Sequence, residues 1–384
     1  MGEVAPTSAR PDAGTIAPED RPRAAAELAR LRRRLFLTGA AVGVIAPLAS
    51  WYLGFSGSLW AASEVLPRWP GLAAYLAATW GVLGLVSLPL AYYRGYVVPR
   101  RFGLSRQSLR GWLADGAKAG LLGNGLATVA GLLLYWSLWS LGASWWWVYG
   151  AIGGAAIVLL TFLAPYVLLP LFFKPRPIED GPIKVSIEDL VRQAGTRVAG
   201  IARLDFSRRT EEANAAVIGY GRSRRVVLAD TLLDRFTPDE IRGVVAHEFG
   251  HHVHGDVRRL LVAQLATTFA GLFAAAKLAD PLLRRIGAPP LKDPRSLPLL
   301  LAATELAGLL AIPVLNGWSR ALEARADRYA IALTGDGRSF ASAMRRLADQ
   351  NLAEERPPRW AELLLYSHPP IYRRVQAAEE AARG

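Results

Sequence analysis

The chain contains no cysteine, so disulfide bonds and thiolate metal ligands are both excluded. Histidine is scarce: only five occur in 384 residues, four of them at positions 247, 251, 252 and 254 and one at position 368. Charged residues form 20% of the chain and apolar residues 52%, which is a high apolar share for a soluble protein. Any transition-metal site must therefore use nitrogen and oxygen ligands, and the clustered histidines are the first candidates.

The net charge of +13 would suit a nucleic-acid partner, but the apolar runs of the chain favour a membrane surface instead. No charged residue occurs within 35–63, within 69–93 or within 119–173. The last run is long enough for two spans, and its centre is rich in tryptophan, as expected of an interfacial hairpin. We therefore predict four spans in an N-terminal membrane domain, residues 31–174, and exclude nucleic acid as a partner.

Basic residues mark one side of these runs. Arginines precede the first run at positions 30, 32, 33 and 34, and the connection 94–118 carries six basic residues against Asp115 alone. The positive-inside rule then puts the N-terminus, this connection and everything after Lys174 in the cytosol. We predict a multi-pass protein of the plasma (inner) membrane, with residues 1–30 as a mobile cytosolic tail.

Residues 175–258 change character and indicate a soluble α+β segment. A helical pattern covers 185–193, and a glycine-rich turn is predicted at 219–222. Three stretches have strand composition, namely 201–206, 213–218 and 225–228.

The next helix has a well-marked start. Thr237 suits the N-cap and Pro238 the first helical position, and Glu240 would complete a capping box. We predict a helix that runs through His251 and ends near Gly255.

This helix carries the motif His-Glu-Phe-Gly-His. His247 and His251 are four residues apart, so both rings lie on one face and can share a Zn²⁺. Glu248 directly follows the first histidine and is placed to take a proton from the attacking water. His252 and His254 lie off that face or beyond the helix end, and we expect them to surround the site or to lie on the surface.

Two more apolar stretches, 260–276 and 296–319, indicate a transmembrane hairpin within 259–318. The loop between them is basic, against the charge rule, so the hairpin is either re-entrant or has its topology fixed by the earlier spans. Glu305 interrupts the second stretch and should face other helices or a water-filled cavity, because a carboxylate is costly in lipid.

A catalytic zinc site of this kind needs a third ligand, usually a carboxylate. In the remaining segment, 319–384, Glu323 and Asp327 are four residues apart on one face of a predicted helix. Glu323 would bind the metal, and Asp327 would accept the free ring N–H of a histidine ligand. Such a pair is by itself usually a solvated helix face, but beside a zinc-binding helix the metal site is the favoured interpretation.

Four segments, spanning residues 100–375, resemble the CAAX prenyl proteases, which are membrane-embedded zinc metallopeptidases of the gluzincin type. In order, the segments are Arg101–Ser105 before an apolar helix, Asn214-Ala215 before the strand 225–228, the motif His247–His251 with Glu323 and Asp327, and Ser367–Pro370 before Arg374. Three features differ from the family: six spans where eukaryotic members have seven, Ala216 where an aromatic residue is usual, and Gly255-Asp256, which is more similar to HtpX-type membrane proteases.

The resemblance implies a role for each motif position. Zinc ligands would be His247, His251 and Glu323, and Glu248 would be the general base. Asn214 would hold the substrate backbone beside an edge strand. His368 and Arg374 would stabilise the oxyanion or bind the C-terminal carboxylate of the substrate. Without the resemblance, the sequence favours an ordinary loop histidine before a Pro-Pro turn as the interpretation of His368.

We therefore predict a mainly α protein: a polytopic α-helical membrane protein of about six spans with a cytosolic gluzincin-type α+β zinc protease domain. The expected activity is that of a zinc metalloendopeptidase, with Zn²⁺ as cofactor. Its expected substrates are peptides or membrane proteins, including prenylated C-terminal peptides. Two alternatives remain open: an HtpX-like quality-control protease, and a non-catalytic metal-binding membrane scaffold, which would have no need for Glu248.

Overall fold

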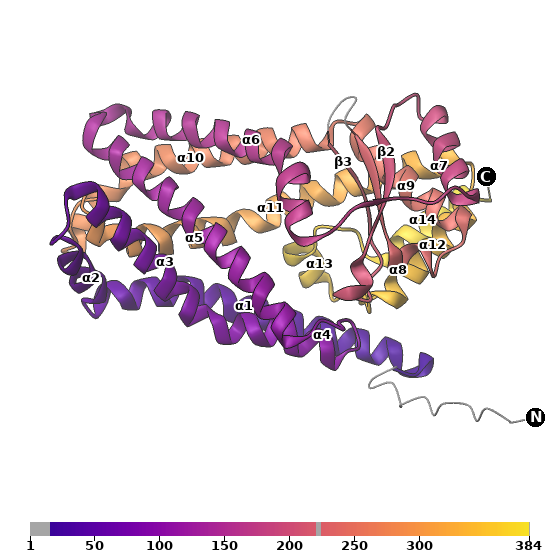
Figure 1. Ribbon diagram of the computed structural model, residues 1–384, viewed down its shortest axis with the longest axis horizontal. Helices are drawn as coiled ribbons and strands as arrows, with labels where there is room; N and C mark the ends of the chain where they lie inside the picture. The colour runs from indigo at the N-terminus through magenta and orange to yellow at the C-terminus, as the bar shows by residue number, and fades with distance from the viewer. Residues whose placement is uncertain (1–15, 220–223, 384) are drawn as a thin grey trace, which may run out of the picture.

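The computed structural model describes residues 16–219 and 224–383, and the protein is mainly helical. Long helices run side by side through one part of the molecule, and a smaller domain with a sheet lies at one end of these helices (Figure 1). The helices of the long part are α1 (Arg21–Tyr52), α2 (Phe55–Ser63), α3 (Arg68–Tyr92), the π-helix η2 (Tyr93–Val97), α4 (Val98–Arg101), α5 (Leu109–Ser140), α6 (Trp145–Phe172), α10 (Asp256–Arg285) and α11 (Leu297–Thr334).

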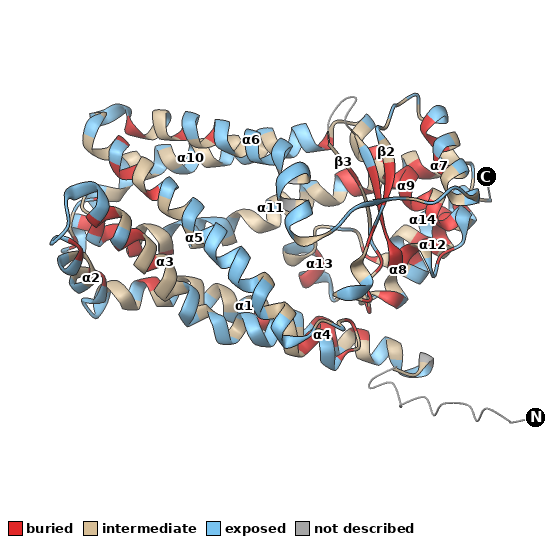
Figure 2. Ribbon diagram, viewed as in Figure 1, coloured by how far each residue is buried: buried red, intermediate tan, exposed pale blue. Residues whose placement is uncertain are grey.

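Six helical stretches in the described residues are long and apolar enough to cross a membrane, which confirms the predicted number. They cover 21–52, 68–101, 109–140, 142–163, 256–285 and 294–334. Between 0% and 28% of the residues in their apolar windows are buried, and most of this part is exposed or half-buried in Figure 2. Such sparse burial suits helices in lipid, where apolar surface needs no protein cover.

Glu305 lies inside the last span and faces another helix. A Cβ added to Gly43 of α1 would lie 3.1 Å from Glu305 Cδ. The carboxylate thus points toward α1, as predicted from the cost of charge in lipid. Helix α11 continues through Pro313 to Thr334, so the predicted boundary at 318/319 falls within one continuous helix.

The predicted mobile tail is wrong for its last part, because α1 already begins at Arg21. Leu28 is buried in a small cluster with Phe102, and Arg21 pairs with Asp349 at 2.6 Å. The residues that cover this first part of α1 are distant in the sequence, so local composition could not reveal them. Residues 1–15 of the predicted tail lie outside the described residues.

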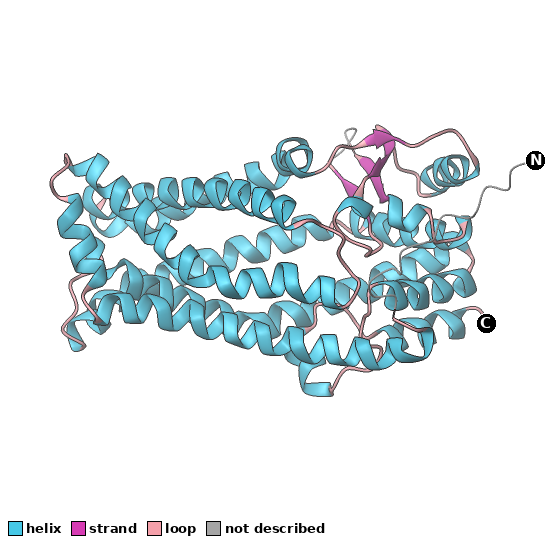
Figure 3. Ribbon diagram, turned by 60° about the horizontal axis from the view of Figure 1, so that its bottom comes forward, coloured by secondary structure: helices cyan, strands magenta, loops and turns pink. Residues whose placement is uncertain are grey.

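The smaller domain has a four-stranded sheet in the order β1-β2-β4-β3, shown in magenta in Figure 3. Strands β2 and β4 are parallel, and β3 pairs antiparallel with β4 at the edge. The strands are β1 (Arg176–Pro177), β2 (Gly200–Leu204), β3 (Ala215–Ile218) and β4 (Arg225–Ala229). The last three confirm the predicted strands, whereas of the predicted turn only Gly219 lies in the described residues.

Helices cover the inner face of the sheet and form the buried core of this domain with it (Figure 2). They are α7 (Pro182–Gln193), α8 (Asp230–Leu233), α9 (Pro238–Val253), α12 (Gly337–Gln350) and α14 (Ile371–Ala381), whereas α13 (Arg359–Leu365) packs against α11. The predicted capping box of α9 is present: Thr237 Oγ1 accepts the N–H of Glu240 at 3.3 Å, and Glu240 Oε2 accepts the N–H of Thr237 at 2.9 Å. The cap fixes where α9 begins, and its apolar face anchors it in the core.

Candidate active site

The face of α9 that carries the histidines lies directly against α11. A Cβ added to Gly250 would be only 3.0 Å from Ala326 Cα, closer than side chains normally allow. Gly250 immediately precedes His251, and Ala326 lies between Glu323 and Asp327. The missing side chain at position 250 therefore lets the two carboxylates come within reach of the histidines.

Three potential ligands converge at this contact. The Nε2 atoms of His247 and His251 are 3.2 Å apart. Glu323 Oε2 lies 3.3 Å from the first of them, and Glu323 Oε1 lies 3.4 Å from the second. A tetrahedral zinc ion with bonds of about 2.0–2.1 Å holds its ligand atoms about 3.3 Å apart. The group is thus compatible with zinc in both chemistry and spacing.

The other nitrogen of each imidazole is held by a carboxylate. His247 Nδ1 lies 2.8 Å from Asp327 Oδ1, and His251 Nδ1 lies 3.0 Å from Asp256 Oδ2. Because carboxylates only accept hydrogen bonds, each neutral ring carries its proton on Nδ1 and turns a lone pair on Nε2 toward Glu323. Converging lone pairs and a carboxylate repel one another, and a cation between them would remove that repulsion. Glu323 Oε2 is also buried without a hydrogen-bond partner in the described residues.

Asp256 is a site residue that the sequence analysis missed. It is 2% exposed at the start of α10 and forms an ion pair with Arg325 of α11. Gly255, with a φ of 67°, follows the end of α9 and reverses the chain direction, so that Asp256 lies beside His251. The available signal was an acidic residue directly after the glycine that ends the motif helix.

Burial lowers the pKa of His247, but the adjacent carboxylates of Asp327 and Glu323 outweigh it and raise this pKa to about 9. Burial also lowers the pKa of His251, and hydrogen bonds with its carboxylate neighbours again raise it overall. A metal cation competes with these protons for the same lone pairs. Burial raises the pKa of Glu248, as expected for a carboxylate that must both accept and release a proton.

Two members of the convergent group, His247 and Glu323, line a cavity of about 660 Å³. Glu248 and Glu323 line the cavity together with Asn214 at the edge of the sheet. Phe36 of α1 and Ile312 of α11 also line it, and both belong to candidate spans. The cavity therefore extends from the sheet edge to the membrane domain.

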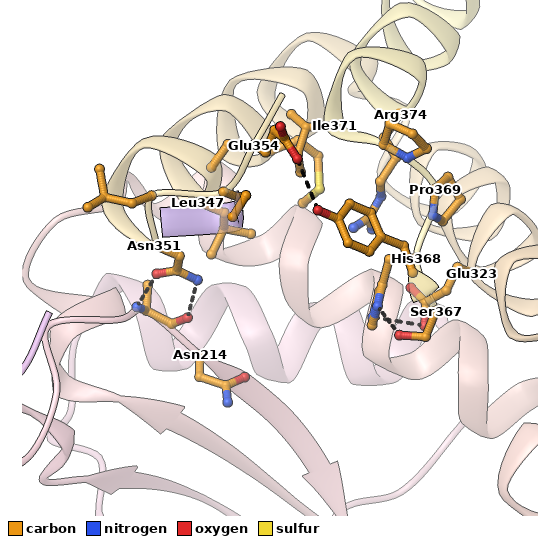
Figure 4. Close-up of a pocket in the computed structure, with 18 of the residues that line it drawn as sticks. Asn214, Glu323, Leu347, Asn351, Glu354, Ser367, His368, Pro369, Ile371 and Arg374 are labelled. Atoms are coloured by element: carbon orange, nitrogen blue, oxygen red, sulfur yellow. Dashed lines mark hydrogen bonds and ion pairs between the residues drawn. The ribbon is translucent and has the colours of Figure 1, made fainter. Parts of the chain in front are cut away.

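The two predicted oxyanion residues differ in their surroundings. His368 lies exposed in the loop between α13 and α14, with Nε2 3.4 Å from Glu323 Oε1 (Figure 4). The side chain of Arg374 is only 10% exposed, and its Nε and Nη2 donate to Asp327 at 2.8 Å and 2.6 Å. Asp327 in turn binds His247. Arg374 is thus linked to His247 of the convergent group through the carboxylate of Asp327.

The loop that carries His368 is fastened to the helix that carries Glu323. Arg320 lies one turn before Glu323, and its Nη1 donates to the carbonyl oxygens of Glu362 and Tyr366 at 2.8 Å and 2.6 Å. These carbonyls lie at the C-terminal end of α13, where a helix lacks internal donors. These two hydrogen bonds, called the Arg320 clamp below, hold the loop at a fixed place relative to Glu323.

Tyr366 also ties this loop to the first span. Its hydroxyl donates to Glu354 Oε2 at 3.0 Å and accepts from Arg33 Nη1 at 2.8 Å. Arg33 and Glu354 form an ion pair of 2.5 Å, with side chains only 10% and 13% exposed. All three residues line the cavity, so its wall depends on contacts between the two domains. These partners come from three distant segments, and sequence reasoning did not find them.

The outer edge of β3 faces outward beside this cavity. The carbonyl of Asn214 accepts the N–H of Ala229 in β4 at 2.9 Å. Because backbone groups alternate along an antiparallel pair, those of Ala213, Ala215 and Val217 point away from β4.

Side chains occupy two of these three positions. Asn351 accepts the N–H of Ala213 at 2.9 Å and donates to its carbonyl at 3.3 Å, as a neighbouring strand would. His252 Nε2 lies 2.8 Å from the carbonyl oxygen of Val217. The outward backbone groups of Ala215 lie between these two contacts.

Three more residues singled out by the sequence, Asn214, His252 and His254, lie outside the convergent group. Asn214 is exposed and lines the cavity, but the alternation of β3 directs its side chain to the face opposite Val217. His252 lies at the strand edge, and His254 Nδ1 lies 2.7 Å from the carbonyl of Gly250 at the end of α9. Neither histidine belongs to the convergent group, as predicted.

Two family models match consecutive parts of the chain. The model of peptidase family M48 matches residues 177–382. The model described as the CAAX prenyl protease N-terminal region, with five membrane helices, matches residues 12–174. In the described part of that second range, four helical stretches qualify as spans.

Named relatives and a solved structure agree with these matches. The uncharacterized metalloprotease YhfN of Bacillus subtilis is 28% identical over 300 residues, which cover 77% of this chain and 70% of the relative. CAAX prenyl protease 1 of Saccharomyces cerevisiae is 32% identical over 190 residues, covering 48% and 41%, and its homolog in Oryza sativa is 28% identical over 322 residues, covering 80% and 73%. The crystal structure of S. mikatae Ste24p matches with a TM-score of 0.84 at 23% identity, covering 97% of this chain and 92% of that one, so the two share a fold.

Proposed function

The chain belongs to peptidase family M48, as a membrane metallopeptidase of the CAAX prenyl protease type, and we propose that it hydrolyses peptide bonds of membrane-associated substrates in the cavity beside α9. The observation that carries this proposal is the convergence of His247, His251 and Glu323 at the point where Glu248 enters the cavity. A non-catalytic metal scaffold would need the ligands but not the half-buried carboxylate of Glu248 beside them.

The metal would be zinc, held by His247, His251 and Glu323. Asp327 and Asp256 would keep the proton of each ring on Nδ1, which leaves Nε2 free as a ligand. When bound, zinc would supply Lewis-acid polarisation of the scissile carbonyl.

The proton transfers would belong to Glu248. Its carboxylate would accept a proton from the attacking water and return that proton to the leaving amine. His368 would donate a hydrogen bond to the carbonyl oxygen as negative charge develops there.

Arg374 would act as a positioning residue. Two of its nitrogens bind Asp327, which makes a direct contact with the oxyanion or with a terminal carboxylate the less favoured role. By holding Asp327, Arg374 would keep the ring of His247 in its ligand orientation.

An extended substrate would add to the outer edge of β3. The N–H and C=O of Ala215 would form the ladder bonds, since Asn351 already binds both groups of Ala213 and His252 the carbonyl oxygen of Val217. Asn214 would contact the substrate where it enters this edge.

The substrate class follows from the apolar wall that Phe36 and Ile312 contribute from the spans. A peptide with a prenylated C-terminus would place its lipid there, which makes CAAX-type substrates the first candidate. A transmembrane segment would use the same wall, so the second candidate is an HtpX-like quality-control protease. Cleavage of a prenylated CAAX peptide, compared with the unmodified peptide and with a misfolded membrane protein, separates the two.

The basic residues at one end of the spans further support a cytosolic active site in the plasma (inner) membrane. Cysteine accessibility tests this orientation cleanly, because the natural chain has no cysteine. A single cysteine in the exposed loop before α9, such as Asp234→Cys, should react with a membrane-impermeant reagent only after the membrane is opened. Labelling in intact cells would reverse the assignment.

Replacement of Glu248 tests the chemistry. The variant Glu248→Gln should keep its zinc but lose peptide cleavage by a factor of about 100 to 10,000. The matched variant Glu323→Ala should lose zinc as well. Full residual cleavage in Glu248→Gln would exclude the proposed mechanism, and unchanged zinc content in Glu323→Ala would exclude that residue as a ligand.

A further inference from the structure

A second cavity, of about 800 Å³, lies where the membrane helices meet the protease domain. Its lining comes from the first turn of α1, from the end of η2 and α4, and from the segments before α9 and after α12. The charged side chains of the lining are Arg21, Arg100, Arg101, Arg106, Arg235 and Glu211. Five guanidinium groups thus face a shared space with one carboxylate.

Aromatic residues place this cavity at the edge of the membrane domain. Tyr96 lines the cavity at the end of the span 68–101. Its ring stacks on Tyr92 at 5.4 Å and lies 6.1 Å from Trp112, near the start of the span 109–140. Tyrosine and tryptophan gather at the level of the lipid headgroups. The arginines of the cavity therefore lie at headgroup depth.

The positive charge of this cavity is not neutralised by its own carboxylate. Arg106 and Arg235 both bind Glu211, each at 2.5 Å, so two cations share one anion. Arg100 donates to the carbonyl oxygen of Gln107 at 2.7 Å and lies 5.2 Å from the Tyr96 ring. Across 16–219 and 224–383, no carboxylate pairs with Arg100. The cavity consequently carries excess positive charge at the Arg106–Glu211–Arg235 group and at Arg100.

The other two arginines form ion pairs that an anion can replace. Arg101 binds Glu27 at 2.6 Å, and both side chains are at least half exposed. Arg21 binds Asp349 at 2.6 Å, with side chains 26% and 60% exposed, so the carboxylate is the more accessible partner. Exposed ion pairs contribute little to stability, so exchanging them for an incoming anion costs little.

We propose that this cavity binds the phosphate of an anionic membrane lipid. The planar guanidinium group matches phosphate oxygens through paired hydrogen bonds. The cavity also has an apolar lining, to which Phe102, Leu104 and Leu352 contribute, and this suits the glycerol and upper acyl carbons of a lipid better than a free ion. Anionic lipids concentrate where basic residues meet the membrane surface.

This site is distinct from the catalytic cavity, but the two share a wall. Leu352 lines both of them, and the adjacent Asn351 holds Ala213 at the start of the edge strand. The lipid site does not depend on peptidase activity, so it stands or falls separately from the proposed function.

The full chain can be tested in nanodiscs of phosphatidylcholine with or without phosphatidylglycerol. We expect phosphatidylglycerol to raise the melting temperature and to co-purify with the protein, as measured by native mass spectrometry. The double variant Arg100→Gln/Arg106→Gln should bind this lipid about thirtyfold more weakly. The matched control Arg30→Gln/Arg34→Gln removes the same charge from exposed positions of α1 outside the cavity and should bind as the natural chain does.

Inorganic phosphate distinguishes a lipid from a soluble anion. Added to protein in neutral detergent, millimolar phosphate should leave the melting temperature nearly unchanged. A full shift with phosphate alone would overturn the lipid assignment, as would equal loss in the control variant. If the double variant does not fold, equal retention of phosphatidylcholine and phosphatidylglycerol by the natural chain would also overturn it.

Discussion

Gly250 of α9 lies so close to Ala326 of α11 that a side chain at position 250 would be crowded, and this close approach brings the two histidines within reach of Glu323. In Gly250→Ala the added methyl would meet Ala326 Cα at 3.0 Å, so the helices must separate by a few tenths of an ångström. We expect this variant to bind zinc at least tenfold more weakly, because ligand geometry tolerates deviations of only about 0.2 Å. Titration against a competing chelator measures the change.

Gly243 provides the matched control on the same helix. A Cβ there would meet Phe340 at 3.5 Å, which is ordinary van der Waals contact. Alanine is favoured over glycine within a helix by about 1 kcal/mol, so Gly243→Ala should keep its zinc and be at least as stable. Equal zinc loss in both variants would show that the Gly250 contact has no special role.

Asp256 should matter for zinc binding although it is not a ligand. In Asp256→Asn the side chain can no longer serve as a charged acceptor for His251 Nδ1, and Arg325 loses its ion pair. We expect zinc affinity to fall about 10- to 100-fold. The exposed Asp239→Asn on the first turn of α9 is the control and should bind zinc normally. Unchanged affinity in Asp256→Asn would mean that the His251 ring is oriented by other contacts.

Arg320 should affect turnover without affecting zinc content. The variant Arg320→Gln loses the clamp on the carbonyl oxygens of Glu362 and Tyr366, so His368 is no longer held in place. We expect kcat to fall about 10- to 100-fold, as misplaced catalytic groups commonly cause. Arg320→Lys should restore part of the loss, since one ammonium group reaches fewer carbonyls than the guanidinium fork.

The control for Arg320 is Arg328→Gln, two turns further along α11 on an exposed position. Its kcat and zinc content should match those of the natural chain. If Arg320→Gln lowers the free energy of unfolding but leaves kcat unchanged, the clamp has no positioning role.

Asp230 should make the stability of the protease domain depend on pH. Burial raises its pKa, but hydrogen bonds from the hydroxyl and N–H of Ser207 and from the N–H of Thr231 outweigh burial and hold the pKa below its usual 3.8. A lowered folded-state pKa stabilises the fold above about pH 4, and this stabilisation is lost as pH falls through the folded-state pKa. Asp230→Asn should cost about 1–3 kcal/mol at pH 7.

The difference in unfolding free energy between Asp230→Asn and the natural chain should therefore shrink toward pH 3. Denaturant unfolding in detergent at pH 7 and pH 3 measures it. A difference that stays constant with pH would show that Asp230 contributes through packing instead of charge.

Local rules were sufficient for much of this protein. Apolar runs predicted six spans, and the cap at Thr237 predicted where the motif helix starts, because both signals lie within one element. The four-residue spacing of His247 and His251 likewise needs only the period of a helix. The need for a carboxylate ligand and the same four-residue spacing singled out Glu323 and Asp327, which the fold brings to the same point.

Local rules failed where a contact joins segments far apart in the chain. The prediction of a mobile tail was wrong from Arg21 onward, because Leu28 packs with Phe102 and Arg21 pairs with Asp349, both far away in the sequence. The roles of Asp256, Arg320 and Asn351 were likewise invisible, because a polar residue beside a turn looks the same whether it is solvated or bound to a distant partner.

The sequence by itself determined which residue types the site contains and which helix carries the motif, since helix period, capping and hydropathy act over a few residues. Only the tertiary structure decided what those residues touch. It paired Arg374 with Asp327 instead of leaving it free for the oxyanion, and it left Ala215 between the occupied positions of β3. The convergence of His247, His251 and Glu323 likewise depends on the close approach of α9 and α11 at Gly250, a contact between helices that no local pattern encodes.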